Sequence, residues 1–526
     1  MSIVSLHFFI FTGVILTLYW ICVPKWRWIV LFIATSYFLF LNTYRNIAAC
    51  AIFVMDVLTV WLAALCLKKN LQEQTKKRIL FFTLFFVVAV LILYKELSFF
   101  INNINSIGRI AGIDYGLRLP KWVAPFGISY FTLILIGYLL DVYWGTIETP
   151  QKNPLKMILF AGYFPQLTSG PFSRYNDIAG SLFGNASWNL KRVQFGIQRF
   201  LWGLFKKLVI AERLAVAVST IYDSKPLPLQ EDTYVGLMVV IGAFVYVAQL
   251  YTDFSGCMDI VIGISEMFGI PLAENFCRPF SSTSLSEIWR RWHMTLGFWL
   301  KDYVLYPVLK SGWMNRVRKF CKKKWGKSAS RDIPTYIGMF ITWFCVGFWH
   351  GGSWKYIFSS GLFFFVMIVG GLLLQPVFHK LITLLKINTD TWSWVFFQRM
   401  RSFCLFSISV SFGRRADLLD GVRAWKTVFT NWNPWVLFDD TIFRLGLDRK
   451  DFDVCVVRLI VVLVVSMLQN RYGGVRDVGC CLIRAVAENY DRIVCHYNRN
   501  VDEEPLSISY QQVCQAYLCA ASNGCI

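Results

Sequence analysis

Residues 47–67 read IAACAIFVMDVLTVWLAALCL, and about 20 apolar residues are enough to cross a bilayer as an α-helix. Ten further apolar runs follow the same pattern: residues 3–22, 28–41, 79–93, 123–142, 208–218, 234–250, 333–349, 356–374, 392–410 and 454–468. The shorter ones, together with residues 157–167 and 258–270, are typical of broken, tilted or re-entrant helices. We therefore expect an all-α, polytopic membrane protein with about 10–13 transmembrane, re-entrant and interfacial helices.

The composition agrees with a chain embedded in a membrane. Of the 526 residues, 56% are hydrophobic and only 16% are charged, a balance that would not keep a globule of this size in solution. The fifteen cysteines are scattered and often lie inside apolar runs, so they predict neither a disulfide framework nor a metal site. Without an internal repeat or a low-complexity linker, we expect a membrane domain over residues 1–470 and a polar, cysteine-containing extension over residues 471–526.

Basic segments predict the orientation of the chain. Lys25 and Arg27 follow the first apolar run, five cations lie within residues 68–78, and nine lie within residues 310–331. Such segments stay cytoplasmic, which places the N-terminus of a retained first helix outside the cytoplasm, in a multi-pass protein of the cell membrane. The net charge of +21 reflects this bias and attraction to anionic lipid headgroups. No nucleic-acid partner is expected, because no soluble domain is available to shape a groove.

Two of the five histidines lie in segments of unusual composition. His293 belongs to WRRWHMTL, residues 289–296, and His350 belongs to GFWHGGSW, residues 347–354. An ionisable group at membrane depth is costly, so each is a candidate for a reaction centre or a proton path. The simpler interpretation of His293 is a core histidine that has found a hydrogen-bond partner.

Helical spacing places His293 on an aromatic stripe. At about 100° per residue, Trp289, Trp292 and His293 fall on one face, and the stripe continues to Val304. We expect one interfacial helix there, with cations on its opposite face.

His350 ends an apolar run before two glycines. A helix rising from Pro334 at roughly 1.5 Å per residue would carry His350 about 24 Å, toward the outer half of the bilayer. The alternative for His350 is a hinge without chemistry.

Both histidine segments, with KDYVLYP at residues 301–307, resemble the signature of the membrane-bound O-acyltransferase (MBOAT) family, in its bacterial alginate O-acetylase and teichoic-acid D-alanylation branch. The resemblance covers roughly residues 1–470, and further segments are similar in the same order: residues 125–132, 138–143, 164–171, 203–207 and 251–256. The chain departs from that branch at its C-terminus, which lacks the aromatic membrane-end motif that the branch often carries.

The resemblance implies a central tunnel that joins a cytoplasmic thioester donor to an external hydroxyl acceptor. It implies that His350 is catalytic and that His293 is a second functional histidine. An imidazole can take the proton from an attacking hydroxyl, or it can be acylated itself. As donors to the developing oxyanion we rank His293 ahead of Asn275 and Arg278.

Three acidic residues lie in or beside apolar segments: Asp141, Asp253 and Asp259. Each could orient an imidazole, but a structural ion pair or hydrogen bond is the favoured role, because buried charges require partners.

The expected function is an O-acyltransferase that moves an acyl group, first of all acetyl, to hydroxyls of an extracellular or cell-envelope polysaccharide. The donor would be acetyl-CoA or a phosphopantetheine-carrier thioester, with no bound cofactor and no metal. Partners would be membrane lipids, the cytoplasmic donor or carrier protein, and an extracytoplasmic acyltransferase. Two alternatives stay open: D-alanyl transfer to teichoic acid from a carrier-protein thioester, and a non-catalytic transporter or scaffold.

Overall fold

The computed structural model describes residues 1–472 apart from 45, 121, 185 and 224–233. In this part of the chain every regular element is a helix, and one isolated antiparallel bridge joins Phe276 to Trp292. The all-α prediction is therefore confirmed. The contacts divide the chain after Leu459, and the description below concerns the unit Met1–Leu459. The predicted extension over residues 471–526 lies almost wholly outside the described residues.

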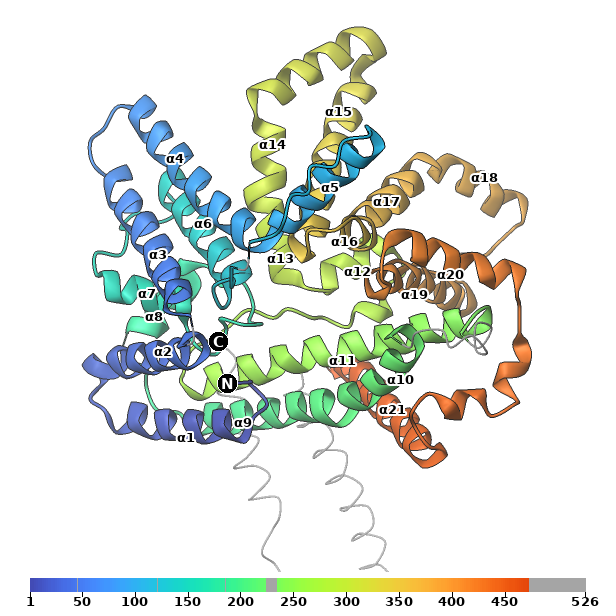
Figure 1. Cartoon of the computed structure of the whole chain (residues 1–526), viewed down its shortest axis with the longest axis horizontal. Helices are drawn as coiled ribbons and strands as arrows, with labels where there is room; N and C mark the ends of the chain where they lie inside the picture. The colour runs from blue at the N-terminus through green and yellow to red at the C-terminus, as the bar shows by residue number, and fades with distance from the viewer. Residues whose placement is uncertain (45, 121, 185, 224–233, 473–526) are drawn as a thin grey trace, which may run out of the picture. The chain divides into compact units, whose positions relative to one another are not determined.

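The α-helices follow one another along the chain as shown in Figure 1. Their bounds are α1 Leu6–Ile21, α2 Arg27–Thr43, α3 Ile47–Leu67, α4 Glu73–Leu91, α5 Leu97–Ile110, α6 Ile128–Trp144, α7 Pro154–Gly162, α8 Tyr175–Phe183, α9 Leu190–Leu204, α10 Glu212–Asp223, α11 Leu237–Met267, α12 Leu285–Arg291, α13 Met294–Leu300, α14 Tyr306–Lys310, α15 Gly312–His350, α16 Trp354–Ile357, α17 Phe363–Leu373, α18 Gln375–Leu384, α19 Trp392–Arg414, α20 Leu418–Thr430 and α21 Arg449–Tyr472.

Four helical segments of the described residues are long and apolar enough to cross a membrane. They are Ile47–Leu67, Glu73–Ile110, Leu237–Met267 and Trp354–Leu373. Two of them are compound, because a π-helical turn joins α4 to α5 and another joins α16 to α17. With the shorter apolar helices α1 and α6 between them, the chain is a multi-pass membrane protein.

Local sequence explains where several helices begin and end. The Ser5 hydroxyl accepts a hydrogen bond from the amide of Phe8 at 3.3 Å, which caps α1. Helix α6 is bounded by Gly127 and Gly145, with φ of 76° and 86°. Side chains rarely adopt such left-handed conformations, so glycine defines both ends of α6.

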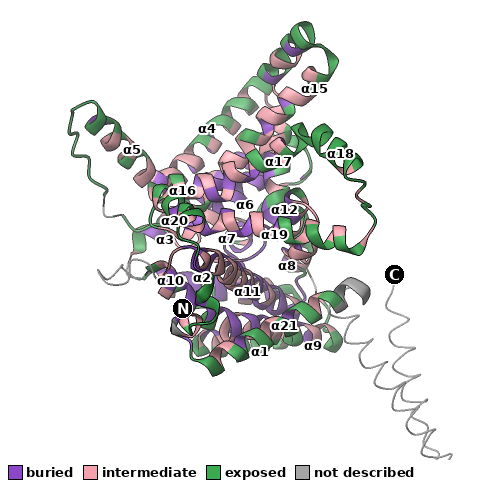
Figure 2. Ribbon diagram, turned by 90° about the vertical axis from the view of Figure 1, so that its right-hand side faces the viewer, coloured by how far each residue is buried: buried purple, intermediate pink, exposed green. Residues whose placement is uncertain are grey.

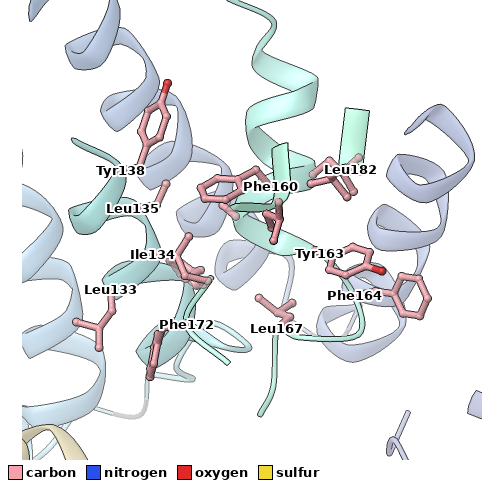
Figure 3. Packing of buried hydrophobic residues seen from close by; sticks show 14 of the residues in the cluster. Leu133, Ile134, Leu135, Tyr138, Phe160, Tyr163, Phe164, Leu167, Phe172 and Leu182 are labelled. Atoms are coloured by element: carbon pink, nitrogen blue, oxygen red, sulfur yellow. The ribbon is translucent and has the colours of Figure 1, made fainter. Parts of the chain in front are cut away.

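Helix α6 forms the centre of the hydrophobic core. All its residues from Phe131 to Val142 are buried, and Figure 2 shows the buried residues gathered around α6, α7 and α11. Figure 3 shows Ile134 and Tyr138 of α6 in one cluster with Phe160 of α7 and with Leu167 and Phe172 of the segment that follows α7. A helix enclosed on all sides offers a rigid wall for a site.

Helices α9 and α11 run side by side (Figure 1) and approach closely at two pairs of glycines. A Cβ atom on Gly263 would lie 2.7 Å from the carbonyl oxygen of Gly196, and one on Gly203 would lie 2.7 Å from that of Gly256. The glycines are seven residues apart on each helix, which places them on one face. Small residues at such spacing let two helix backbones meet in a membrane.

The predicted separation of residues 234–250 from residues 258–270 is wrong, because α11 is continuous through both. The polar residues between them remain helical because they find partners. The Thr252 hydroxyl donates to the carbonyl of Ala248 at 2.8 Å, and Asp253 pairs with Lys207 of the neighbouring segment at 2.6 Å.

The single interfacial helix expected from Trp289 to Val304 is also wrong. Helix α12 ends at Arg291, and His293 has φ 49° before α13 begins. The break arises from backbone pairing with a distant segment, since the amide of Cys277 donates to the carbonyl of Arg291 at 2.9 Å. The basic block at residues 310–331 differs from expectation as well: it lies almost wholly on α15, which bends at Gly326 and does not begin at Pro334.

Candidate functional site

The imidazole of His293 is fixed by Asn275, which lies in the segment paired with residues 291–292. Both side chains are buried, and His293 Nδ1 lies 3.2 Å from Asn275 Oδ1. The same oxygen accepts hydrogen bonds from the Thr295 amide at 3.1 Å and the Thr295 hydroxyl at 2.9 Å. The backbone carbonyl of Asn275 accepts from the Met294 amide at 3.0 Å. One asparagine thus determines both the ring orientation and the start of α13.

This network also determines the tautomer of His293. A backbone amide can only donate, so the atom of Asn275 that faces Thr295 is the oxygen, and His293 Nδ1 must carry the proton. His293 lies outside the four candidate spans. Burial of its ring, and to a lesser extent the neighbouring His350, holds the pKa of His293 well below its usual value. At neutral pH the ring is therefore uncharged, and its Nε2 is a hydrogen-bond acceptor.

Aromatic rings pack around His293, and one of them also contacts His350. The His293 ring stacks on Phe172 at a centroid distance of 5.8 Å and meets the edge of Phe254 at 4.8 Å. The Trp349 ring lies 6.0 Å from that of His293 and 5.0 Å from that of His350. Trp349 is anchored by its indole N–H, which donates to the carbonyl of Ser129 at 3.2 Å. Both histidine rings therefore contact this indole.

His350 differs from His293 in its surroundings. It is the last residue of α15, and its side chain is exposed, whereas that of His293 is buried. Within the described residues its imidazole makes no hydrogen bond, so both ring nitrogens are available to a substrate. The two imidazoles are still close enough to interact electrostatically.

A cavity reaches the His293 network from the other direction. It holds about 520 Å³ of space between atoms, open solvent included, and extends from the exposed Asp177 and Ala273 to the buried Phe172 and Thr295. Phe172 stacks on His293, and Thr295 shares Asn275 with it. The inner end of the cavity is therefore one side chain away from His293.

The remaining predicted residues have mostly structural partners. Asp141 accepts a hydrogen bond from the Tyr303 hydroxyl at 2.8 Å, and Asp253 pairs with Lys207. Asp259 pairs with Arg199 at 3.0 Å and also with Lys206. These contacts agree with the structural role that the sequence favoured for all three aspartates.

The structure removes His293 from first place among the candidate oxyanion donors. His293 uses its one N–H on Asn275 and presents a lone pair at Nε2, so the neutral ring has no donor left. The side-chain amide of Asn275 faces the sulfur of Met258 at 3.2 Å. Arg278 adopts a left-handed conformation (φ 50°) at the start of a 3-10 turn. Among the residues described, no three His, Cys, Asp or Glu side chains gather as metal ligands would.

Sequence reasoning missed Lys95 and Glu96, which contact the segment around His350. The signal was present, because two charged residues follow the apolar run at residues 79–93 after a single tyrosine and continue the same span. The apolar run alone predicts a helix that ends at Leu93, before both residues.

Substituting Asn275 with alanine is expected to lower the free energy of unfolding by about 3 kcal/mol, because three buried donors lose their acceptor. Substituting Thr295 with valine removes one of these donors and its acceptance of the Phe172 amide, so a loss of about 1 kcal/mol is expected. Thermal unfolding of the detergent-solubilised proteins measures both. Equal midpoints for the Asn275 variant and the unsubstituted protein would contradict this description of the network.

Comparison with known proteins identifies relatives of this chain. The family model described as membrane-bound O-acyltransferase matches residues 147–321. The probable alginate O-acetylases AlgI of Pseudomonas syringae and Pseudomonas putida are each 30% identical over 67% of this chain, covering 62% and 67% of those proteins. The peptidoglycan O-acetyltransferase of Helicobacter pylori is 27% identical over 61% of the chain and 60% of its own length. The chain thus spans about three fifths to two thirds of these relatives.

Proposed function

This chain belongs to the membrane-bound O-acyltransferase family, and we propose that it transfers an acetyl group from a thioester to a hydroxyl of a cell-envelope polysaccharide across the membrane. The observation that carries the proposal is a chain of contacts. The cavity lining contacts His293 through Phe172, and the rings of both His293 and His350 contact Trp349. A donor entering the cavity reaches Phe172, which stacks on His293, and an acceptor from the outer side meets the exposed His350.

The chemistry assigned to His350 follows from its free ring nitrogens. As the acceptor hydroxyl attacks the thioester carbonyl, His350 takes the hydroxyl proton. The tetrahedral intermediate then expels the thiolate, to which the imidazolium returns that proton, so the products are an ester and a thiol. His293 stacks on Phe172 at the inner end of the cavity and positions that wall of the donor site. This division of roles uses the different surroundings of the two rings.

Orientation is inferred from the basic segments and helix lengths. Helix α4 starts beside the basic segment at residues 68–78, and Glu96 lies about 34 Å farther along the helix at roughly 1.5 Å per residue. That distance is close to the thickness of the hydrocarbon core, about 30 Å. With the basic segments in the cytoplasm, His350 faces the outer side and the N-terminus is extracytoplasmic.

In this orientation the cavity lies toward the cytoplasmic side, where the basic segments are. Tyr138, which lines it, accepts a hydrogen bond from the Gln151 amide at 2.8 Å. The carbonyl of Gln151 in turn accepts from the indole of Trp61, near the end of α3 that precedes Lys68. A cytoplasmic thioester would therefore enter near Asp177 and Ala273.

An acetyl group is favoured because the relatives reported above are named as O-acetylases and an O-acetyltransferase. Acetyl-CoA is the donor to test first, ahead of an acetylated phosphopantetheine carrier. On the outer side, the acceptor is either the polysaccharide hydroxyl itself or the hydroxyl of an extracytoplasmic acyltransferase that passes the group on. Both acceptors present the same nucleophile to His350.

Filling the cavity mouth tests the donor route. Substituting Ala273 with tryptophan places an indole in the cavity, and we expect the KM for acetyl-CoA to rise on the order of tenfold, a binding loss of about 1.4 kcal/mol. Initial rates with radiolabelled acetyl-CoA measure it, with Ala51→Trp on the exposed face of α3 as the matched control. Unchanged kinetics in a folded Ala273→Trp protein would exclude this cavity as the donor route.

A further inference from the structure

A charged pair lies within one of the candidate spans, beside the segment that carries His350. The π-helical turn Ile92–Glu96 joins α4 to α5 and contains Lys95 and Glu96, whose Nζ and Oε1 atoms are 3.4 Å apart. Glu96 is only 2% exposed, and Lys95 is largely covered. Buried charges are costly, and π-helical turns occur frequently at functional sites. The pair therefore requires an explanation beyond packing.

Lys95 acts on the end of α15. Its ammonium donates a hydrogen bond to the carbonyl oxygen of Trp349, and Nζ also lies 5.0 Å from the centre of the Trp349 ring. It interacts electrostatically with the imidazole of His350. A cation at the last carbonyls of a helix satisfies acceptors that the helix itself leaves open and complements the helix dipole. Lys95 thus fixes the carbonyl of Trp349, the residue directly before His350.

Glu96 contacts the chain that follows His350 in sequence. A Cβ atom on Gly352 would lie 2.3 Å from Glu96 Oε2, so the carboxylate occupies the space that a side chain there would need. Three residues further along α5, the ring of Phe99 packs on Phe348 at 5.6 Å and on Trp354 at 5.5 Å. The turn and the start of α5 therefore contact the chain before and after His350.

We infer that Lys95 and Glu96 form a positioning pair for His350: Lys95 fixes the Trp349 carbonyl, and Glu96 holds Lys95 while it packs against Gly352. The inference rests on the proposed transfer at His350, and the pair acts through that residue without touching the substrate. Small displacements of a reacting group by about 1 Å can reduce a rate by about 10²-fold. Loss of the pair should therefore lower kcat and leave the KM for the donor unchanged.

The double variant Lys95→Met with Glu96→Gln distinguishes a role in positioning His350 from a role in stabilising the fold. Removing one partner leaves a buried charge unpaired and is expected to destabilise the protein, whereas replacing both with neutral groups of similar size restores folding. We expect the double variant to unfold near the midpoint of the unsubstituted protein, with kcat for acetyl-CoA-dependent transfer lowered about 10²-fold and KM within about twofold. A folded double variant with unchanged kcat overturns the inference.

Gly352→Ala provides a second test that keeps both charges. Its Cβ would push the Glu96 carboxylate aside, and the backbone there has no left-handed conformation to strain. A lower kcat with an unchanged unfolding midpoint is expected, whereas Gly371→Ala on α17, where a Cβ meets nothing within 4 Å, should match the unsubstituted protein. Normal kcat in a folded Gly352→Ala protein also overturns the inference. Full transfer by His350→Ala would instead refute the proposed function, so the two failures are distinguishable.

Discussion

Replacing His350 with alanine is expected to lower the rate of acyl transfer by about 10²–10⁴-fold, the usual contribution of a positioned proton acceptor. The substitution should leave the fold intact, because the imidazole makes no hydrogen bond within the described residues and its side chain is exposed. Transfer of radiolabelled acetyl from acetyl-CoA to envelope polysaccharide, in membranes that hold equal amounts of each protein, measures the loss.

The matched control is His379→Ala on α18, an exposed histidine remote from the cavity lining. Its rate should equal that of the unsubstituted protein. If His350→Ala retained a normal rate with a normal unfolding midpoint, proton transfer at His350 would be excluded.

Replacing Gly263 with leucine is expected to remove stably folded protein. A Cβ at this position would lie 2.7 Å from both the carbonyl oxygen of Gly196 and the amide nitrogen of Phe200, so α9 and α11 would have to separate. Overpacking costs about 1–3 kcal/mol where side chains can adjust, and backbone atoms cannot adjust in that way. We expect a loss of at least about 3 kcal/mol, seen as a collapse in the yield of monodisperse protein.

Helix α11 also carries side chains of the site, which gives this prediction a second readout. Phe254 contacts the His293 ring, and Met258 receives the side-chain amide of Asn275, so residual protein should have lost activity. Gly13→Leu on α1 is the control, because a Cβ there meets nothing within 4 Å. If the two variants were equally stable, close contact between α9 and α11 would be refuted.

Local patterns were sufficient to predict the helical class. Long apolar runs such as Ile47–Leu67 become helices because backbone groups in a membrane must be satisfied within the segment. The ion pairs of Asp253 and Asp259 were predictable for a similar reason, since a buried charge requires a partner.

Features that depend on distant contacts could not be predicted in this way. Residues 289–304 have helical spacing on both sides of His293, and only pairing with residues 275–277 interrupts the helix. The same pairing reverses the role assigned to His293, since Asn275 takes up its single N–H. Neither effect has a signal within the segment itself, because both arise from residues 275–277, which lie outside it.

The sequence therefore singles out the two histidines of the candidate site, but not the residues that contact them. His293 and His350 were identified from their cost in a membrane and from a family resemblance. The contacts of Trp349 with both histidine rings, and the hydrogen bond from Lys95 to the Trp349 carbonyl, became apparent only from the structure. Their assigned roles in transfer remain predictions for the experiments described above.

The most direct test of the account is mass spectrometry of envelope polysaccharide from cells that lack this chain and produce it again from a plasmid. The account predicts that O-acetyl esters return with the unsubstituted protein and with His379→Ala, and stay absent with a folded, membrane-inserted His350→Ala protein. Return of D-alanyl esters in place of acetyl esters would contradict the assigned acyl group. Full O-acetylation in the His350→Ala cells would contradict the central claim that transfer takes place at His350.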